Sequence, residues 1–253
     1  HEHKRTQDMH DEFQAKLASD IVGHNPLSEF PEGLTLDDAY ALLPSVAERV
    51  CDRKIRGLKA GLTNTDLQPF FGLDHALLGY VYDRGELILG DGIPLLAGSQ
   101  IECELAIILD ADGQPKSLAP AIEFVYVNFS RPEDMTAANL VVSSLGADRF
   151  LVGEQMPWSE VDFDAIKNSK LTAKLDGSTI METSPMDSLG GPEQALQWCT
   201  SEARKRGLQI EDGSVLLCGT CGGGLPMLTG GYSVDYGSLG RIDYEVTMSS
   251  RSH

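Results

Sequence analysis

Two carboxylates stand two residues apart in one of the most apolar stretches of the chain. Residues 101–109 contain Glu102 and Glu104 among hydrophobic neighbours, and Glu123 stands alone in the next apolar stretch, residues 121–127. Side chains two apart on a β-strand point to the same face of a sheet, so Glu102 and Glu104 are predicted to lie side by side. Neighbouring carboxylates with buried flanks repel one another, and a divalent ion such as Mg²⁺, which prefers oxygen ligands, relieves that repulsion.

The three glutamates are therefore a candidate metal site, with one alternative left open. Three carboxylates on adjacent strands would place their oxygens on one side of an ion and leave positions for water and substrate. In the alternative, Glu102 and Glu104 lie on the solvated face of an edge strand, and Glu123 is unrelated to them. The spacing alone does not decide between the two.

A lysine and a glycine-rich stretch are further candidates for chemistry. Lys59 stands between Gly57 and Gly61 in an apolar segment. If it is buried, its ammonium can reach a pocket and exchange protons; otherwise it is an ordinary surface lysine. Residues 219–224 follow an apolar segment and read Gly-Thr-Cys-Gly-Gly-Gly. This composition favours a loop whose backbone N–H groups closely approach a carboxylate or carbonyl ligand.

The spacing of the cysteines and histidines does not indicate a further functional site. Cys218 and Cys221 have the C-x-x-C spacing, but no second pair or nearby histidine accompanies them, so the signal for a zinc or redox site is weak. Five cysteines are an odd number at irregular spacing, and reduced thiols are expected. His24 and His75 stand isolated in the sequence.

The elements that would position these residues are helical first and strand-rich later. Apolar periodicity predicts helices over residues 8–22 and 37–50, the second with Thr35 and Asp38 as a start signal. Short apolar runs predict strands at residues 77–82, 86–89, 101–109 and 122–127. Later in the chain we predict a hairpin around Asp176-Gly177, a helix framed by Pro192 and Gly207, and a buried strand at residues 214–217. We expect an N-terminal helical segment, 1–52, and a β-rich catalytic core, 53–250, in a single α+β domain.

Composition narrows the classes of partner. The 253 residues include 20 basic and 38 acidic ones, for a formal net charge of −18, which argues against nucleic acid or an anionic membrane surface as a partner. Hydrophobic residues make up 42% of the chain, enough for a globular core. Apolar runs fall short of the roughly 18 to 20 residues that span a bilayer, and residues 1–14 lack the apolar centre of a signal peptide, so a cytoplasmic location is expected.

Several short motifs, taken in their order along the chain, resemble the fumarylacetoacetate hydrolase superfamily. They are G-x-K-x-G-L-T at residues 57–63, E-x-E at 102–104, Pro-Ala ahead of Glu123, Gly-Thr at 219–220 and Tyr-Gly-Ser-Leu-Gly at 236–240. The branch that the chain is most similar to comprises the 2-keto-4-pentenoate hydratases and 4-oxalocrotonate decarboxylases. The likeness runs from Arg53 to Val246 and depends on the ordered combination of motifs.

The resemblance implies both an architecture and a site. The implied fold is a mixed β-sheet roll or barrel-like core with N-terminal helices. The implied cofactor is Mg²⁺ or Mn²⁺, held by Glu102, Glu104 and Glu123 and chelating the oxygens of a small α-keto acid, with Lys59 as the catalytic group that transfers protons. The implied substrate-binding residues are Gly61, Leu62, Thr63, Asn139, Gly219 and Thr220.

The implied activity is that of a lyase that adds water to a 2-hydroxypenta-2,4-dienoate-like acid. The alternative is a decarboxylase of the 4-oxalocrotonate or oxaloacetate type, or a keto–enol tautomerase, since one enolate serves all these reactions. A C–C bond hydrolase of β-diketones ranks third, because His24 lies before the matched region and the His-Glu pair of that branch has no clear counterpart. From another class, the chain could be a non-catalytic accessory subunit. The partners implied are the small acid, further copies of the chain in a homo-oligomer and an enzyme of the same pathway.

Overall fold

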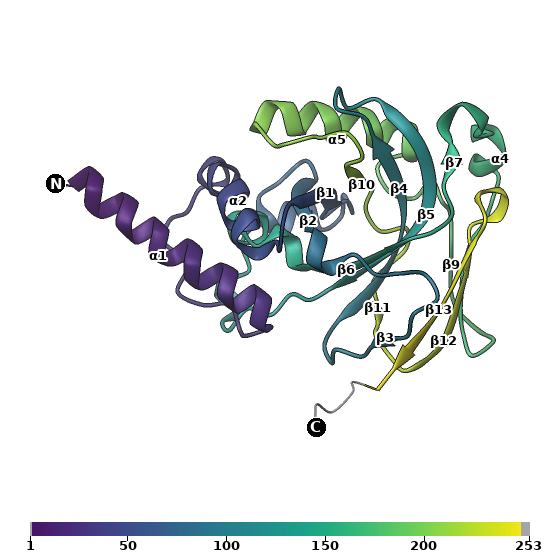
Figure 1. The fold of residues 1–253 in the computed structure, drawn as a ribbon, viewed down its shortest axis with the longest axis horizontal. Helices are drawn as coiled ribbons and strands as arrows, with labels where there is room; N and C mark the ends of the chain where they lie inside the picture. Colours follow the sequence, from purple (N-terminus) through teal and green to yellow (C-terminus); the bar gives the residue numbers. More distant parts are fainter. Residues whose placement is uncertain (1, 249–253) are drawn as a thin grey trace.

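The computed structural model describes residues 2–248 and has its N-terminal helices at one end and strongly curved β-sheets at the other (Figure 1). Residue 1 and residues 249–253, which include the outer ends of segments 1–52 and 53–250, lie outside the described residues. The helices are α1 (Glu2–Gly23), α2 (Leu36–Val50), α3 (Ala137–Val142), α4 (Phe163–Lys167) and α5 (Pro192–Arg206). The strands are β1 (Ile55–Gly61), β2 (Leu77–Tyr82), β3 (Ile93–Pro94), β4 (Gln100–Leu109), β5 (Pro115–Val125), β6 (Ala147–Val152), β7 (Met156–Pro157), β8 (Leu171–Leu175), β9 (Ser178–Thr183), β10 (Val215–Leu217), β11 (Leu225–Pro226), β12 (Gly230–Asp235) and β13 (Arg241–Thr247).

Two sheets build the β core. The eight-stranded sheet has the order β2-β1-β10-β4-β5-β6, with β11 added to β4 and β7 added to β5. It is a mixed sheet, because β1 runs parallel to β10 but antiparallel to β2. The five-stranded sheet has the order β3-β13-β12-β8-β9. The rings of Phe124 on β5 and Tyr244 on β13 meet edge to face at 5.7 Å, which joins the two sheets across the core.

The N-terminal helices pack beside β2. Helix α2 begins with the predicted signal, since Thr35 Oγ1 accepts a hydrogen bond from the Asp38 N–H at 3.1 Å. It buries Leu43 and Val46, and the hydroxyl of Tyr40 accepts a hydrogen bond from the Leu78 N–H of β2 at 2.9 Å. Helices α1 and α3 pack against α2 in turn. In the described part of the chain, no helix is both long and apolar enough to cross a membrane.

Of three local predictions made from the sequence, a hairpin turn and a helix end are confirmed, and a strand is wrong. Asp176 and Gly177 both have positive φ, 48° and 83°, and turn β8 into β9 as predicted. Helix α5 ends at the left-handed Gly207. The predicted strand at residues 86–89 is instead a loop with one bridge, from Glu86 to Phe150, and Ile88 is 70% exposed. Leu87 packs against the core, whereas Ile88 and Leu89 are exposed, because the segment makes a single bridge to β6 instead of pairing along it.

Strand β1 fits between β2 and β10 only because residue 57 is glycine. Gly57 lies opposite Val215 of β10, and a Cβ atom at this position would collide with the Val215 carbonyl oxygen. Gly79 of β2 is similarly close to the backbone of Ser144. The position of β1, and of the lysine it carries, therefore depends on a close backbone approach.

Gly57→Ala should destabilise the protein by about 3 kcal/mol, because the added Cβ would meet the Val215 backbone, which cannot move aside as a side chain could. Gly223→Ala is the matched control, since nothing lies within 4 Å of its Cβ position and its φ is not left-handed. Urea unfolding followed by circular dichroism measures both variants. Equal stability of Gly57→Ala and the parent would show that β1 and β10 tolerate a wider separation.

Candidate metal centre and active site

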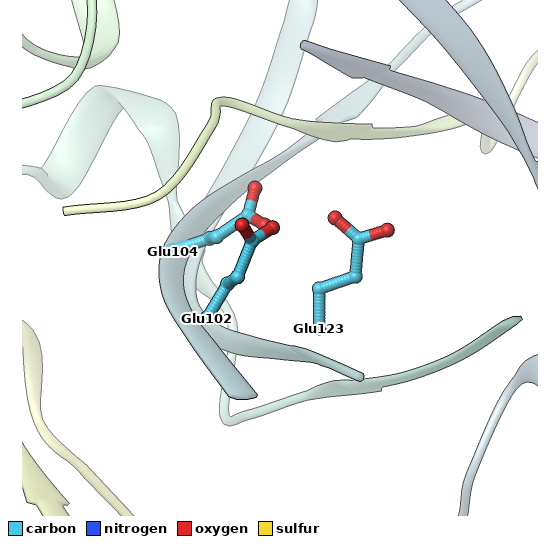
Figure 2. A group of neighbouring side chains, drawn as sticks. All are labelled: Glu102, Glu104 and Glu123. Carbon is cyan, nitrogen blue, oxygen red and sulfur yellow. The ribbon is translucent and has the colours of Figure 1, made fainter. Parts of the chain in front are cut away.

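The register of β4 and β5 brings the three glutamates together. Glu102 lies directly opposite Glu123 in the antiparallel pair, and Glu104 follows two residues later on the same face of β4. Figure 2 shows the three side chains converging from the two strands. One ligand atom from each lies within 4.8 Å of the others. Glu104 and Glu123 are 0% and 1% exposed, and Glu102 is partly buried, so the solvated edge-strand alternative is wrong.

Only some of the glutamate oxygens have partners. Glu104 Oε1 accepts a hydrogen bond from the Gly219 N–H at 2.8 Å. Glu123 Oε2 lies 2.6 Å from Lys59 Nζ. Within the described residues, Glu104 Oε2 and Glu123 Oε1 are buried with no hydrogen-bond donor. Buried carboxylate oxygens are rarely left without a partner, so these two fit a cation rather than a structural hydrogen bond.

Burial and mutual repulsion favour the protonated forms of two of these carboxyl groups. Burial, followed by the charge of Glu123, raises the pKa of Glu102 to about 7. Burial, then the charges of Glu123 and Glu102, raises the pKa of Glu104 well above its usual range. Keeping all three carboxylates ionised in a low-dielectric pocket, with one lysine beside them, has a high cost in free energy. Without a cation the cluster therefore retains protons at neutral pH.

Lys59 is fully enclosed rather than exposed. Its side chain is 2% exposed, and Nζ donates a hydrogen bond to the Leu145 carbonyl oxygen at 3.0 Å in addition to its contact with Glu123. Ser144 and Leu145 both have positive φ, 52° and 51°, a conformation that is costly for non-glycine residues. This strained turn between α3 and β6 aims the Leu145 carbonyl at the lysine.

The glycines on either side of Lys59 allow close contacts of β1 with its neighbours. Gly57 allows close packing on β10, and a Cβ atom on Gly61 would meet the Leu145 side chain at 2.8 Å. They allow close packing of β1, which positions the lysine by tertiary contacts.

A cavity of about 980 Å³ opens next to Glu102. Of the expected substrate-binding residues, four line it: Gly61, Leu62, Thr63 and Thr220. Leu62 takes a left-handed conformation, with φ of 52°, where the chain leaves β1. The Thr220 hydroxyl donates to the Gly222 carbonyl oxygen at 3.3 Å. The predicted loop after β10 thus forms part of the cavity wall.

Two of the expected substrate-binding residues, Asn139 and Gly219, do not line this cavity. Asn139 lies on α3 and lines a separate cavity near Phe30 and Arg131, and its side-chain amide donates to the Asp134 carbonyl oxygen at 2.8 Å. Its short helix packs against α2. The Gly219 N–H donates to Glu104 Oε1 at 2.8 Å and so orients this glutamate, and a contact of Gly219 with the substrate stays a prediction.

Sequence reasoning missed several residues of the site. His75, Asp74, Asp187 and Trp198 line the cavity, although they come from separate loops and from α5. His75 had appeared isolated, and no local pattern links it to Glu102. His24, also isolated in sequence, pairs with Asp148 Oδ1 at 2.8 Å, far along the chain on β6.

The cysteines show no sign of redox or zinc chemistry. All five, at positions 51, 103, 199, 218 and 221, are free thiols in the described chain, as expected. Burial raises the pKa of Cys221 to about 12 and that of Cys218 well above its usual range. The thiolate is the reactive form of cysteine, so both are held in the unreactive form.

Solved structures share this architecture, whereas no protein-family model matches the sequence. The 4-oxalocrotonate decarboxylase from Pseudomonas putida G7, complexed with magnesium and adipate, is similar with a TM-score of 0.81 and 18% identity, over 95% of this chain and 98% of that one. The chain shares the fold of this decarboxylase and of a putative fumarylacetoacetate hydrolase family protein from Yersinia pestis CO92. Fumarylpyruvate hydrolase from Pseudomonas aeruginosa, in complex with Mn²⁺ and pyruvate, matches with a TM-score of 0.56 and 13% identity over 78% of this chain and 93% of that one.

A third enzyme, 5-carboxymethyl-2-hydroxymuconate delta-isomerase from Mycobacterium smegmatis, matches with a TM-score of 0.53 and 13% identity over 78% of this chain and 81% of that one. These likenesses establish the fold, and they confirm the expected mixed β-sheet core with N-terminal helices. The decarboxylase matches almost end to end, whereas the hydrolase and the isomerase match about three quarters of the chain.

The raised pKa of Glu102 makes stability depend on pH. Between its usual value of 4.5 and about 7, the folded metal-free protein keeps a proton that the unfolded chain has released. The free energy of unfolding therefore falls as the pH rises through this window. Glutamine does not titrate, so Glu102→Gln avoids this loss of stability. At pH 8 the free energy of unfolding of the metal-free variant should exceed that of the parent by on the order of 2 kcal/mol, and at pH 5 the two values should be much closer.

Urea titrations in EDTA at the two pH values measure this difference. Glu245→Gln, at an exposed position on β13, is the matched control and should change stability little at either pH. If Glu102→Gln and the parent unfold at the same urea concentration at pH 8, the glutamates do not repel one another in the folded state.

Proposed function

We propose that Glu102, Glu104 and Glu123 bind one divalent cation, Mg²⁺ or Mn²⁺. The donor set supports this, because three carboxylates converge within 4.8 Å and two of their buried oxygens have no hydrogen-bond donor. Hard divalent cations prefer such oxygen ligands. The decarboxylase and the fumarylpyruvate hydrolase of the same fold are complexed with magnesium and with Mn²⁺.

The proposed activity is that of a metal-dependent lyase acting on a small 2-oxo acid, and the proposed reaction adds water to a 2-hydroxypenta-2,4-dienoate-like acid. The observation that carries this proposal is the convergence of three glutamates beside a buried lysine, with Glu102 also lining the cavity of about 980 Å³. When bound, the ion would stabilise the negative charge that develops on the 2-oxo oxygen during enolisation.

The residues of the chain would divide the remaining tasks. Lys59 holds a proton at Nζ beside Glu123 and is the proposed group that exchanges it with the substrate carbon. Gly61, Leu62, Thr63 and Thr220 line the cavity and would bind the substrate. The Thr220 hydroxyl makes only a long bond to Gly222, so it can turn toward a carboxylate of the substrate.

Decarboxylation is the second candidate. It is favoured by the match to 4-oxalocrotonate decarboxylase over 95% of this chain, compared with 78% for the fumarylpyruvate hydrolase. The chemistry is closely related, because the electron pair left by departing CO₂ would move into the 2-oxo group and produce an enolate of the kind that hydration also passes through. The two reactions differ in their need for a water molecule positioned in the cavity.

Each glutamate should contribute to metal affinity. Glu104→Gln removes one anionic ligand and should weaken Mg²⁺ binding by about 10-fold or more. Isothermal titration calorimetry on the full chain measures this directly, with the exposed Glu245→Gln as the matched control. Unchanged Mg²⁺ affinity in Glu102→Gln, Glu104→Gln and Glu123→Gln would rule out this site.

Turnover should require both the ion and Lys59. The Mg²⁺-loaded protein should consume a 2-hydroxy-2,4-dienoate in an ultraviolet assay, and Lys59→Met should lower kcat by about 100-fold or more. Lys174→Met, at an exposed position on β8, is the control. Mass spectrometry of the products, with oxaloacetate and 4-oxalocrotonate in the substrate panel, separates hydration from decarboxylation. Near-full turnover by Lys59→Met would assign this lysine a purely structural role.

A further inference from the structure

The cavity beside the glutamates is lined by acids but not by fixed cations. Four of its lining residues carry carboxyl groups: Asp66, Asp74, Glu102 and Asp187. None of the described lining residues is a lysine or an arginine. Lys59 does not line it, because its ammonium is enclosed between Glu123 and the Leu145 carbonyl. His75 is the remaining titratable side chain in the cavity wall.

The orientation of His75 follows from one hydrogen bond. Its Nδ1 lies 2.7 Å from the carbonyl oxygen of Ala76. A carbonyl oxygen can only accept, so Nδ1 must carry the proton. In the neutral ring, Nε2 then has a free lone pair and can accept a proton. His75 is partly buried in the turn that leads into β2, the strand that pairs with β1.

The other bases in the cavity wall are less suited to accept a proton from water. Glu102 is a proposed metal ligand, and its oxygens would be committed to the ion. Asp187 Oδ2 already accepts a hydrogen bond from the Gly222 N–H at 2.8 Å. Asp66 and Asp74 are exposed at the cavity, and a carboxylate is in general a weaker base than an imidazole.

We propose that His75 is a second catalytic residue, the general base for the water that adds to the substrate. This role rests on the proposed hydration. After the dienol has become 2-oxopent-3-enoate, the oxygen of water bonds to C4 and one water proton passes to Nε2. As the C4–O bond forms, the C3=C4 electron pair shifts to the C2–C3 bond and produces an enolate. C3 of this enolate then takes up a proton. His75 releases its proton to solvent, so the sum is substrate plus one water.

Lys59 and His75 are assigned to different steps, so their roles can be tested separately. Lys59 serves enolisation at the metal end, whereas His75 serves water addition in the open cavity. In the Mg²⁺-loaded full chain, His75→Gln should lower kcat for hydration of 2-hydroxypenta-2,4-dienoate by about 100-fold, with KM changed far less. Exchange of the C3 protons of 2-oxopentanoate in D₂O, followed by NMR, needs no water addition and should slow far less. Lys59→Met should lose both reactions.

His10→Gln is the matched control, since His10 lies on α1 and does not line the cavity. Its hydration rate should equal that of the parent. Undiminished hydration by His75→Gln would overturn the assignment, and so would an equal loss of exchange and hydration, because His75 would then only shape the cavity. If the parent neither hydrates the dienoate nor exchanges 2-oxopentanoate, the proposed lyase function itself fails and this role fails with it.

Discussion

Repulsion among three carboxylates at the centre of a buried hairpin is the constraint on which the site depends. Glu102 and Glu123 face each other across β4 and β5, and Glu104 lies on the same face. Among the described residues, Lys59 supplies the positive charge that contacts the cluster, through Glu123. The desolvation cost of the remaining negative charge is large in such surroundings, so the cluster must take up protons or a dication. That requirement links the stability of the fold to the occupancy of the site.

The backbone around Lys59 is arranged to meet this constraint. The left-handed turn at Ser144 and Leu145 costs roughly 1–3 kcal/mol per strained residue and persists only where its surroundings hold it. The Tyr80 N–H donates to Ser144 Oγ at 3.1 Å, and Gly79 leaves room for the Ser144 backbone. The strained turn thus presents the Leu145 carbonyl oxygen to the buried Lys59 ammonium. This hydrogen bond fixes the position of the ammonium group.

The site has two electrostatically different ends. At the metal end, an ion of charge +2 and Lys59 would together balance the three glutamates, so a bound 2-oxo acid would meet a nearly neutral centre. At the open end the cavity wall is acidic, and His75 is the side chain there that can accept and return a proton. Separating the charge-stabilising groups from the proposed water-handling group would let enolisation and water addition proceed as distinct steps.

Local patterns in the sequence determined much of this protein. Alternation along a strand placed Glu102 and Glu104 on one face, Asp176-Gly177 set a hairpin, and the Thr35 capping box began a helix, because each depends on residues a few positions apart. The motif order also pointed to the fold. Only the tertiary structure decided that Glu102 faces Glu123, that Lys59 is enclosed, that Asn139 lies in another cavity and that His75 joins the site. These depend on strand register and on backbone contacts between distant segments, such as Gly57 against Val215, which no local spacing encodes.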